Sequence, residues 1–381
     1  MEYKKLGDIA TYINGYAFKP EQRGSEGLPI IRIQDLTGNA YDLGYYNGDS
    51  PKKIELNDGD VLISWSASLG VYLWNRGKAL LNQHIFKVVF DKVEIDKFYF
   101  MYAVEYNLDK MSLKTHGATM KHITKKDFDN VVIPYPDLDY QKEISYRLTS
   151  LKGIIEKYQE QLDLLDELIK ARFVEMFGDP NIEFKYSSVK FNDLVARMTK
   201  GPFGSDMKKD LFVPKGEDTY KVYIQINAIQ KNQSLGEYYI SKEYFDRKVS
   251  RFELFPNDYI ITCDGTLGKY LKLDENMEKG VISPSLLRLT LQNDKINDKY
   301  FENIWDFYML GLMKKEARNA CLVHLPSAKK IGEISIPVPP LELQNQFASF
   351  VEEVDKSRSR IQKSLEASQE LFDSLMQKYF G

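Results

Sequence analysis

Two segments of this 381-residue sequence mix basic and small residues, a pattern suited to contacts with a ligand rich in negative charge. They are THGATMKHITKKDF (Thr115–Phe128) and KKEARNACLVHLPSAKK (Lys314–Lys330). Small residues let a backbone approach a ligand closely, and Lys, Arg and His donate to phosphate or base acceptors. A solvated basic loop is the alternative interpretation. The candidate DNA-contacting residues in these segments are His116, Lys121, His122, Arg318, Asn319 and His324.

Short polar segments that follow apolar runs supply a second group of candidates. SWSASLG (Ser64–Gly70) holds Trp65, and LNQHIF (Leu81–Phe86) holds two amide side chains, which can pair bidentately with adenine. CDGTLG (Cys263–Gly268) and ISPSLL (Ile282–Leu287) hold the same places later in the chain. The apolar frame persists between these places while the polar residues differ, which favours two modules with one fold and different targets. The candidates chosen by residue type and loop position are Arg32, Gln34, Trp65, Ser66, Asn82, Gln83, His84, Lys200, Lys208, Lys209, Gln225, Asn227, Asp264, Thr266, Lys269, Ser283 and Ser285.

Motifs for catalysis are missing from the sequence. It contains no Gly-x-Gly-x-x-Gly or Walker A loop, and IPYP and IPVPP lack the acid or amide of the tetrapeptide that amino-methyltransferases place around a flipped base. The nearest approach to a nuclease carboxylate set, Glu183-Phe184-Lys185 after Asp179-Pro180, has the wrong order and is interpreted as an inter-unit linker. His116 and His122 lack a nearby Cys or carboxylate pair, so no metal site is expected. The chain is expected to be non-catalytic and to bind no cofactor.

An internal repeat organises the elements that position these residues. IPYPDLDYQKEI (Ile133–Ile144) matches IPVPPLELQNQF (Ile336–Phe347), and ELNDGDVLISWSASLG (Glu55–Gly70) matches ELFPNDYIITCDGTLG (Glu253–Gly268). His122-Ile123 corresponds to His324-Leu325. The chain therefore consists of two divergent copies of one unit.

Each copy is expected to have a strand-rich part followed by a long helix, which makes the fold class α+β. Apolar runs at Pro29–Ile33, Val61–Trp65, His84–Phe90 and Val131–Pro134 are broken by turn residues and predict strands, and Lys97–Leu108 and Lys299–Lys315 are plausible helices. The predicted division is 1–137, 138–178 (helix), 179–340 with a short linker at its start, and 341–381 (helix).

The two predicted helices carry apolar residues at alternating spacings of four and three, which is a heptad seam. Two helices of equal length, each after a Pro-rich entry, favour pairing with each other over separate packing against a sheet. Arg358 and Ser368 are polar seam positions. The apolar seam residues are Ile144, Leu148, Leu151, Ile155, Tyr158, Leu162, Leu165, Ile169, Phe347, Val351, Val354, Ile361, Leu365 and Phe372.

Composition excludes several classes of protein. With 52 Lys and Arg against 55 Asp and Glu, the net charge of -3 does not suit a protein that coats nucleic acid by bulk charge, although a local basic groove is compatible with it. The two cysteines, Cys263 and Cys321, provide no disulfide framework. No apolar run approaches the ~20 residues of a membrane helix, and no secretory signal is visible. A soluble cytoplasmic protein without a membrane partner is expected.

The chain resembles the specificity subunits of type I restriction-modification systems. The resemblance depends on the twofold repeat, the IPxP-x-Leu-x-x-Gln entries at Ile133–Gln141 and Ile336–Gln344, the Gly59–Gly70 and Asn257–Gly268 elements, and the helix ends FVEMFG and LMQKYFG. It spans essentially the whole chain.

This resemblance implies two target-recognition domains joined by two long antiparallel coiled-coil helices. Each domain would bind one half of a bipartite double-stranded DNA target, and the helices would dock two modification subunits. Those partners would supply S-adenosylmethionine chemistry on adenine, and restriction subunits would use ATP and Mg²⁺. The alternatives are a modification-only specificity subunit, a coiled-coil scaffold that binds only protein, and an enzyme whose catalytic motif is unrecognised.

Overall fold

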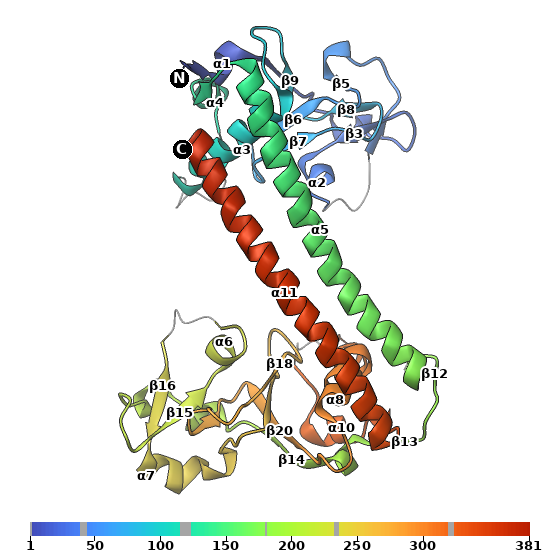
Figure 1. Ribbon diagram of the computed structural model, residues 1–381, viewed down its shortest axis with the longest axis vertical. Helices are drawn as coiled ribbons and strands as arrows, with labels where there is room; N and C mark the ends of the chain where they lie inside the picture. The colour runs from blue at the N-terminus through green and yellow to red at the C-terminus, as the bar shows by residue number, and fades with distance from the viewer. Residues whose placement is uncertain (1, 39–43, 115–122, 180, 232–235, 319–323) are drawn as a thin grey trace. The chain divides into compact units, whose positions relative to one another are not determined.

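The computed structural model describes residues 2–38, 44–114, 123–179, 181–231, 236–318 and 324–381, and of residues 109, 111–114 and 316–318 the backbone alone. The chain divides into two compact units (Figure 1). The first unit is Met1–Gln161 with Ile361–Gly381, and the second unit is Leu162–Arg360. Each unit combines small sheets with helices, so the predicted α+β class is confirmed.

The first unit has two four-stranded sheets and a terminal strand pair. One sheet is antiparallel, in the order β2-β9-β6-β7, and the other has the order β4-β3-β8-β5 with β3 parallel to β8. The strands are β1 (Glu2–Lys5), β2 (Thr11–Asn14), β3 (Leu28–Ile31), β4 (Gly44–Tyr46), β5 (Glu55–Leu56), β6 (Val61–Ser64), β7 (Gly70–Leu73), β8 (Ala79–Leu81), β9 (Ile85–Val89) and β10 (Val132–Tyr135). The helices are α1 (Leu6–Ile9), α2 (Ile33–Leu36), α3 (Lys97–Lys114) and α4 (Lys125–Asp129), with 3₁₀ turns at Pro20–Gln22 and Lys52–Ile54.

The second unit repeats this arrangement. An antiparallel sheet has the order β14-β20-β17-β18, and a second sheet has the order β16-β15-β19 with β15 parallel to β19. The strands are β11 (Gly178–Asp179), β12 (Glu183–Phe184), β13 (Ser188–Lys190), β14 (Val195–Lys200), β15 (Thr219–Tyr223), β16 (Tyr238–Ser241), β17 (Tyr259–Thr262), β18 (Tyr270–Lys272), β19 (Gly280–Ile282), β20 (Leu286–Leu291) and β21 (Ser335–Pro337). The helices are α6 (Gln225–Ala228), α7 (Lys242–Tyr244), α8 (Asp298–Ile304), α9 (Leu310–Arg318) and α10 (Ala328–Gly332). The described residues also form π-helical turns at Phe245–Val249 and Trp305–Met309. They form 3₁₀ turns at Phe191–Leu194, Gly204–Asp206, Lys209–Leu211 and Ser250–Phe252.

A central strand separates two apolar cores in each unit. Along β6, Val61 and Ile63 join the core beneath α3 while Leu62 joins the core of the second sheet. Along β17, Tyr259 and Ile261 face one core and Ile260 the other. Because successive strand residues point to opposite faces, a strand buried on both faces must be apolar throughout. This explains the continuous runs VLI and YII.

The long helices α5 (Leu138–Phe177) and α11 (Leu341–Phe380) each contribute to both units. In the first unit, Arg147 Nη1 near the start of α5 donates to the hydroxyl of Tyr379 near the end of α11 (3.4 Å). In the second unit, Phe173 near the end of α5 packs edge-on against Phe347 near the start of α11 (5.6 Å between centroids). The two helices are therefore antiparallel in both units (Figure 1), as predicted.

The seam residues lie on the covered faces of these helices. Ile144, Leu148, Leu162, Ile169, Phe347, Val351 and Val354 are buried, and the other apolar seam residues are half-buried. The polar seam residue Arg358 forms ion pairs with Asp166 on α5 (2.5 Å) and with Asp355 (3.7 Å). A guanidinium at this place is compatible with the seam because its charge is paired at the edge of the helix contact.

The repeated proline-rich entry has the same role in both units. In the first unit, Tyr99 donates to the carbonyl of Pro134 (2.9 Å), and Gln141 joins the Asp96 amide (3.0 Å) to the Pro136 carbonyl (2.8 Å). In the second unit, Tyr300 donates to the Pro337 carbonyl (2.8 Å). There Gln344 joins the Asn297 amide (2.8 Å) to the Pro339 carbonyl (2.8 Å). Buried polar backbone groups need partners, so a glutamine meets this need where each long helix begins.

The segment interpreted as an inter-unit linker is an ordered hairpin in the second unit. β11 pairs with β12, and the Lys185 amide donates to the carbonyl of Phe177, the last residue of α5 (3.0 Å). Gly178 has a φ of 91°, the left-handed conformation in which glycine commonly ends a helix. The Glu183-Phe184-Lys185 segment therefore has a structural role.

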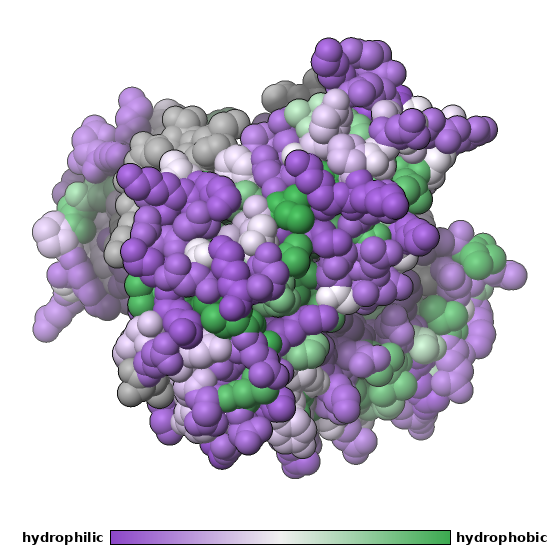
Figure 2. Space-filling model, turned by 90° about the horizontal axis from the view of Figure 1, so that it is seen from above, coloured by the Kyte–Doolittle hydropathy of each residue, from purple (hydrophilic) through white to green (hydrophobic). Residues whose placement is uncertain are grey.

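In the described ranges, none of the helices combines the length and the apolar character needed to cross a bilayer. The face shown in Figure 2 carries mostly hydrophilic side chains, with apolar ones in small separate patches. Scattered apolar side chains of this kind are normal at protein surfaces.

Candidate nucleic-acid interface

A groove of about 580 Å³ in the second unit gathers residues from three segments. It is lined by Ile224, Gln225, Ile226 and Gln230 at α6, by Asp264, Gly265 and Thr266 in the β17–β18 turn, and by Ser283 and Ser285 between β19 and β20. Five of these nine residues, Gln225, Asp264, Thr266, Ser283 and Ser285, are candidates from the sequence. We call this cavity the polar groove.

Backbone hydrogen bonds fix the loops around the polar groove. The Cys263 amide donates to the Ser285 carbonyl (2.8 Å), and the Leu325 amide donates to the Cys263 carbonyl (2.8 Å). The hydroxyl of Thr262 donates to the Thr266 carbonyl within the β17–β18 turn. The turn is therefore held from both sides, and its side chains are presented from a rigid backbone.

Charge in the polar groove is concentrated at Asp264. Its Oδ1 lies 2.5 Å from Nδ1 of His324, and both side chains are partly exposed. A carboxylate accepts hydrogen bonds and repels phosphate, so Asp264 suits an exocyclic amine of cytosine or adenine. Gln225 and Gln230 offer both donors and acceptors.

Cys263 beneath the turn is buried, and burial raises the pKa of its thiol to about 12. The thiolate is the nucleophilic form of cysteine, so a thiol with this pKa is protonated and inert at neutral pH. Cys263 therefore acts as an apolar packing residue.

The first unit has the same pair of backbone hydrogen bonds around its turn, and we call this pair of bonds the loop frame. The Trp65 amide donates to the His84 carbonyl (3.3 Å), and the Ile123 amide donates to the Trp65 carbonyl (3.1 Å). These bonds correspond to those of Cys263, Ser285 and Leu325 in the second unit. The alignment of His122-Ile123 with His324-Leu325 is thereby confirmed for the described residue Ile123.

Side chains on the first-unit frame differ from those in the second unit. The Trp65 ring stacks on Phe86 (5.6 Å between centroids) and meets the edge of His84 (5.0 Å). Asn82 is buried, and its Oδ1 has no hydrogen-bond partner among the residues that the structure describes. The structure thus brings the predicted residues Trp65, Asn82, Gln83 and His84 together, with Ser66 buried beside them.

Several candidates lie elsewhere or have a structural role. The Arg32 side chain is paired with Asp35 (3.1 Å) at the start of α2, and Asn227 donates to the Gly236 carbonyl. Lys269 directly precedes β18, where burial raises the pKa of the nearby Asp306 and the charge of Lys269 opposes that shift. Gln34, Lys200, Lys208 and Lys209 are exposed. The candidates His116, Lys121, His122 and Asn319 lie outside the described residues, as does the side chain of Arg318.

Sequence reasoning missed Gln230 and two glycines. Gln230 follows Gln225 in the polar segment QINAIQ, and its residue type was a usable signal. A Cβ on Gly15 would lie 1.9 Å from the Asn82 carbonyl oxygen, and one on Gly201 would lie 2.0 Å from the Ser283 carbonyl oxygen. Both sites therefore require glycine where the chain crosses the loop that carries candidate residues.

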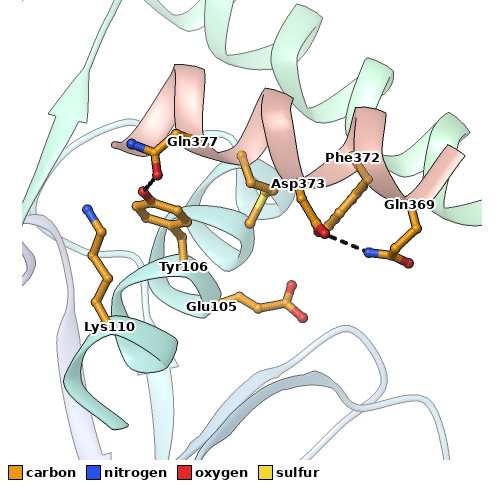
Figure 3. A pocket seen from close by; sticks show the side chains of 8 residues that line it. Glu105, Tyr106, Lys110, Gln369, Phe372, Asp373 and Gln377 are labelled. Atoms are coloured by element: carbon orange, nitrogen blue, oxygen red, sulfur yellow. Dashed lines mark hydrogen bonds between the residues drawn. The ribbon is translucent and has the colours of Figure 1, made fainter. Parts of the chain in front are cut away.

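A second cavity, of about 560 Å³, lies between α3 and the last turns of α11 in the first unit (Figure 3). Its apolar side chains include Phe372 and Met376, and Tyr106 donates to Gln377 across it. Two carboxylates, Glu105 and Asp373, line it with one cation, Lys110. This balance of charge does not favour a phosphate-bearing ligand.

Comparison with known proteins establishes the family. Residues 1–165 and 204–369 match the family described as the type I restriction modification DNA specificity domain. The two matched ranges each hold one copy of the loop frame. The chain belongs to this family and is a specificity subunit of a type I restriction-modification system.

Individual relatives are similar over most of their length. The chain is 22% identical to the Type I restriction enzyme EcoBI specificity subunit of Escherichia coli, over 98% of this chain and 84% of that protein. It is also 22% identical to the Type I restriction enzyme MjaVIII specificity subunit of Methanocaldococcus jannaschii, over 95% of this chain and 89% of that protein.

Solved structures share the fold. The S subunit of the type I restriction-modification system from M. genitalium superimposes with a TM-score of 0.56 at 14% identity, covering 100% of this chain and 96% of that one. A chain from a study of complex assembly and conformational transition of the type I R-M system gives a TM-score of 0.59 at 13% identity, covering 99% and 97%.

Proposed function

We propose that this chain recognises a bipartite, asymmetric DNA target and directs partner adenine-N6 methyltransferase and restriction subunits to it. Residues 1–137 bind one half-site and residues 179–340 bind the other, while the helices 138–178 and 341–381 separate the two recognition domains. The chain itself carries out no chemistry. Two modification subunits use S-adenosylmethionine, and restriction subunits use ATP and Mg²⁺.

The observation that carries the proposal is the repeated loop frame with unlike side chains. Trp65, Ser66, Asn82 and His84 in the first unit correspond to Cys263, Asp264, Ser283 and Ser285 in the second. Two equal frames with the same side chains would suit a palindromic target. Two equal frames with different side chains suit an asymmetric one.

The charge distribution supports a division of labour with partner subunits. The helix 138–178 contains eight acidic and six basic residues, and the helix 341–381 contains seven and five. Together they carry a net charge of -4, whereas the whole chain carries -3. The remaining +1 is too small for non-specific binding to dominate, because that binding depends on many phosphate contacts. Base contacts from the loops, with phosphate neutralisation by partners, fit this balance.

The test is to co-express the chain with its cognate modification subunit and map N6-methyladenine across the host genome by long-read sequencing. A bipartite asymmetric motif that disappears when the chain is deleted supports the proposal. Exchanging residues 1–137 for those of another family member should alter one half of the motif and leave the other unchanged.

The opposite outcome is equally informative. A soluble assembled complex that creates no methylated motif would contradict the proposal and favour a scaffold that binds only protein. Methylation by the isolated chain, measured with radiolabelled S-adenosylmethionine, would contradict its non-catalytic role. A motif that is methylated without restriction would identify a modification-only system.

A further inference from the structure

The loop after β14 places a phenylalanine in solvent beside the polar groove. Gly201, at the start of this loop, lies against the carbonyl of Ser283, which lines the polar groove. Two residues later, the Phe203 side chain is 76% exposed. A singly exposed apolar ring is normal at a protein surface, so the significance of Phe203 depends on what surrounds it.

The loop that carries Phe203 is held in place. The Asp206 amide donates to the Phe203 carbonyl (2.8 Å), and the Tyr244 hydroxyl donates to the Asp206 carbonyl (3.0 Å). The Asp206 carboxylate also pairs with Lys248 (3.6 Å). A ring on an anchored loop loses little conformational freedom on binding, which favours a binding role.

The surroundings of Phe203 are basic. A cavity of about 290 Å³ beside it is lined by Thr199, Lys200, Gly201, Pro202, Phe203, Arg251 and Phe252, with two cations and no carboxylate. Lys208 and Lys209 are exposed further along the same loop. This positive charge favours the phosphates of a nucleic acid as the partner, in preference to an acidic helix such as α5 or α11.

The first unit also has an aromatic side chain near its glycine crossing, although this ring packs edge-on against Phe18 (5.0 Å between centroids). Tyr16 directly follows the crossing glycine Gly15 and is 42% exposed. The Gln83 amide donates to the Tyr16 carbonyl (3.0 Å), so this aromatic also borders the loop of candidate residues. Both units therefore have a partly or largely exposed aromatic side chain within two residues of the crossing glycine.

We infer that Phe203 inserts its ring against a base step at the edge of the second half-site, while Lys200 and Arg251 contact the flanking phosphates. The inference rests on the proposed function and extends it to a stacking contact. Apolar side chains that enter a base step unstack it and bend the duplex. Stacking of this kind tolerates different bases, so Phe203 contributes affinity and distortion in addition to the specificity of the polar groove.

The experiment uses the full chain assembled with its modification subunits. The probe is a duplex that carries the motif found by methylation mapping, with 2-aminopurine at successive positions of the second half-site. Unstacking raises 2-aminopurine fluorescence, so the wild-type complex should give a fluorescence increase confined to one step. Phe203→Ala should abolish that increase and weaken binding about tenfold, while Phe203→Trp should retain both.

Phe255→Ala is the matched control. Phe255 is 41% exposed and packs beside Arg197 (5.5 Å). It lies before β17, at the opposite end of that strand from the turn that lines the polar groove. This variant should match the wild type in fluorescence and affinity. Thermal unfolding of each variant separates a DNA effect from a loss of fold.

Two outcomes would overturn the inference while leaving the proposed function intact. One is a Phe203→Ala complex that methylates the wild-type motif, binds with wild-type affinity and gives the same fluorescence increase. The other is a Phe203→Ala chain that loses modification subunits while its assembled complexes bind DNA normally, which would assign Phe203 to a protein contact. If the wild-type complex methylates no motif, the proposed function fails and the inference fails with it.

Discussion

The two units share a backbone frame and differ in the side chains placed on it. In both, one backbone hydrogen bond joins the turn after β6 or β17 to the residue before β9 or β20. A second joins the same turn to the segment before α4 or α10. In both, a glycine allows the chain to cross that loop closely. At the first position of the turn, however, the first unit has the half-buried Trp65 and the second has the buried Cys263.

This difference shows that the backbone frame is kept while the side chains placed on it vary. Backbone bonds do not depend on residue type, so the frame can be kept while side chains change. The buried glutamines Gln141 and Gln344 and the glycines Gly15 and Gly201 belong to the frame. Ser66, Asp264, Asn82 and Ser283 occupy positions where the copies have diverged.

The largest effect on the target should come from a change that leaves both frames intact. Inserting seven residues after Gln161 and seven after Arg360 lengthens α5 and α11 at the unit boundaries and keeps the heptad phase. Seven helical residues add about 10 Å, or about three base pairs of DNA. Methylation mapping should show both half-sites unchanged with a longer gap, and the original site unmethylated.

Two observations bear on that expectation. Insertion into α5 alone should disrupt the antiparallel pairing and prevent assembly, because partner residues would lose their register. If the double insertion left the original gap in place, the helices would not set the spacing of the half-sites.

Breaking the frame of one unit should cost the most free energy of unfolding. Gln344 is buried and joins the Asn297 amide (2.8 Å) to the carbonyls of Pro339 (2.8 Å) and Lys295 (3.2 Å). Gln344→Ala leaves these buried groups unpaired and should destabilise the second unit by about 3 kcal/mol. Hydrogen exchange resolved by peptide should show faster exchange in the second unit.

Gln346→Ala is the control for this change, because Gln346 is exposed two residues further along the same helix. Gln141→Ala should produce the corresponding loss in the first unit. Equal protection in Gln344→Ala and wild type would show that water replaces the side chain at no cost.

A smaller loss is expected from crowding the loop crossing. Gly201→Ala forces a Cβ toward the Ser283 carbonyl oxygen and should cost about 2 kcal/mol through overpacking and backbone shift. It should also impair recognition of the second half-site, since Ser283 lines the polar groove. Gly204→Ala, at a site with no atom within 4 Å of the added Cβ, should leave both unchanged. Chemical denaturation and DNA titration measure the two effects.

Much of this comparison could be predicted from the sequence because the residue pattern of each main element occurs twice in the chain. The heptad spacing and the IPxP entry predicted the long helices, and the copies aligned VLIS with YIIT, which are β6 and β17. Apolar periodicity is a property of local chain geometry. It therefore survives divergence between the copies.

The functions of individual polar residues could not be predicted in the same way. Arg32 was a candidate for base contacts because of its type, but its charge is paired with Asp35 within one turn of α2. Asn227 is held by the Gly236 carbonyl. A side chain with several donors binds whichever acceptor the folded backbone brings close, and residue type alone does not say which acceptor that is.

The smallest expected effect on stability comes from a substitution that tests whether DNA recognition can change while the backbone frame stays intact. Asp264→Asn keeps the size of the side chain but replaces one acceptor with a donor. Because Asp264 and His324 are both partly exposed, the free energy of unfolding should change by less than about 0.5 kcal/mol. Affinity for the wild-type motif should fall about tenfold, from loss of one base contact in the second half-site.

The pattern of the change distinguishes a base contact from a general charge effect. If Asp264 accepts from one base, Asp264→Asn should relax or alter the motif at one position of the second half-site and leave the first half-site untouched. Asp294→Asn removes an equal charge from an exposed site in the same unit, away from the loop of Phe203. A similar change in affinity for both variants, without a change of motif, would mean that the Asp264 charge acts on the duplex at long range and that specificity lies in the neighbouring amides and hydroxyls.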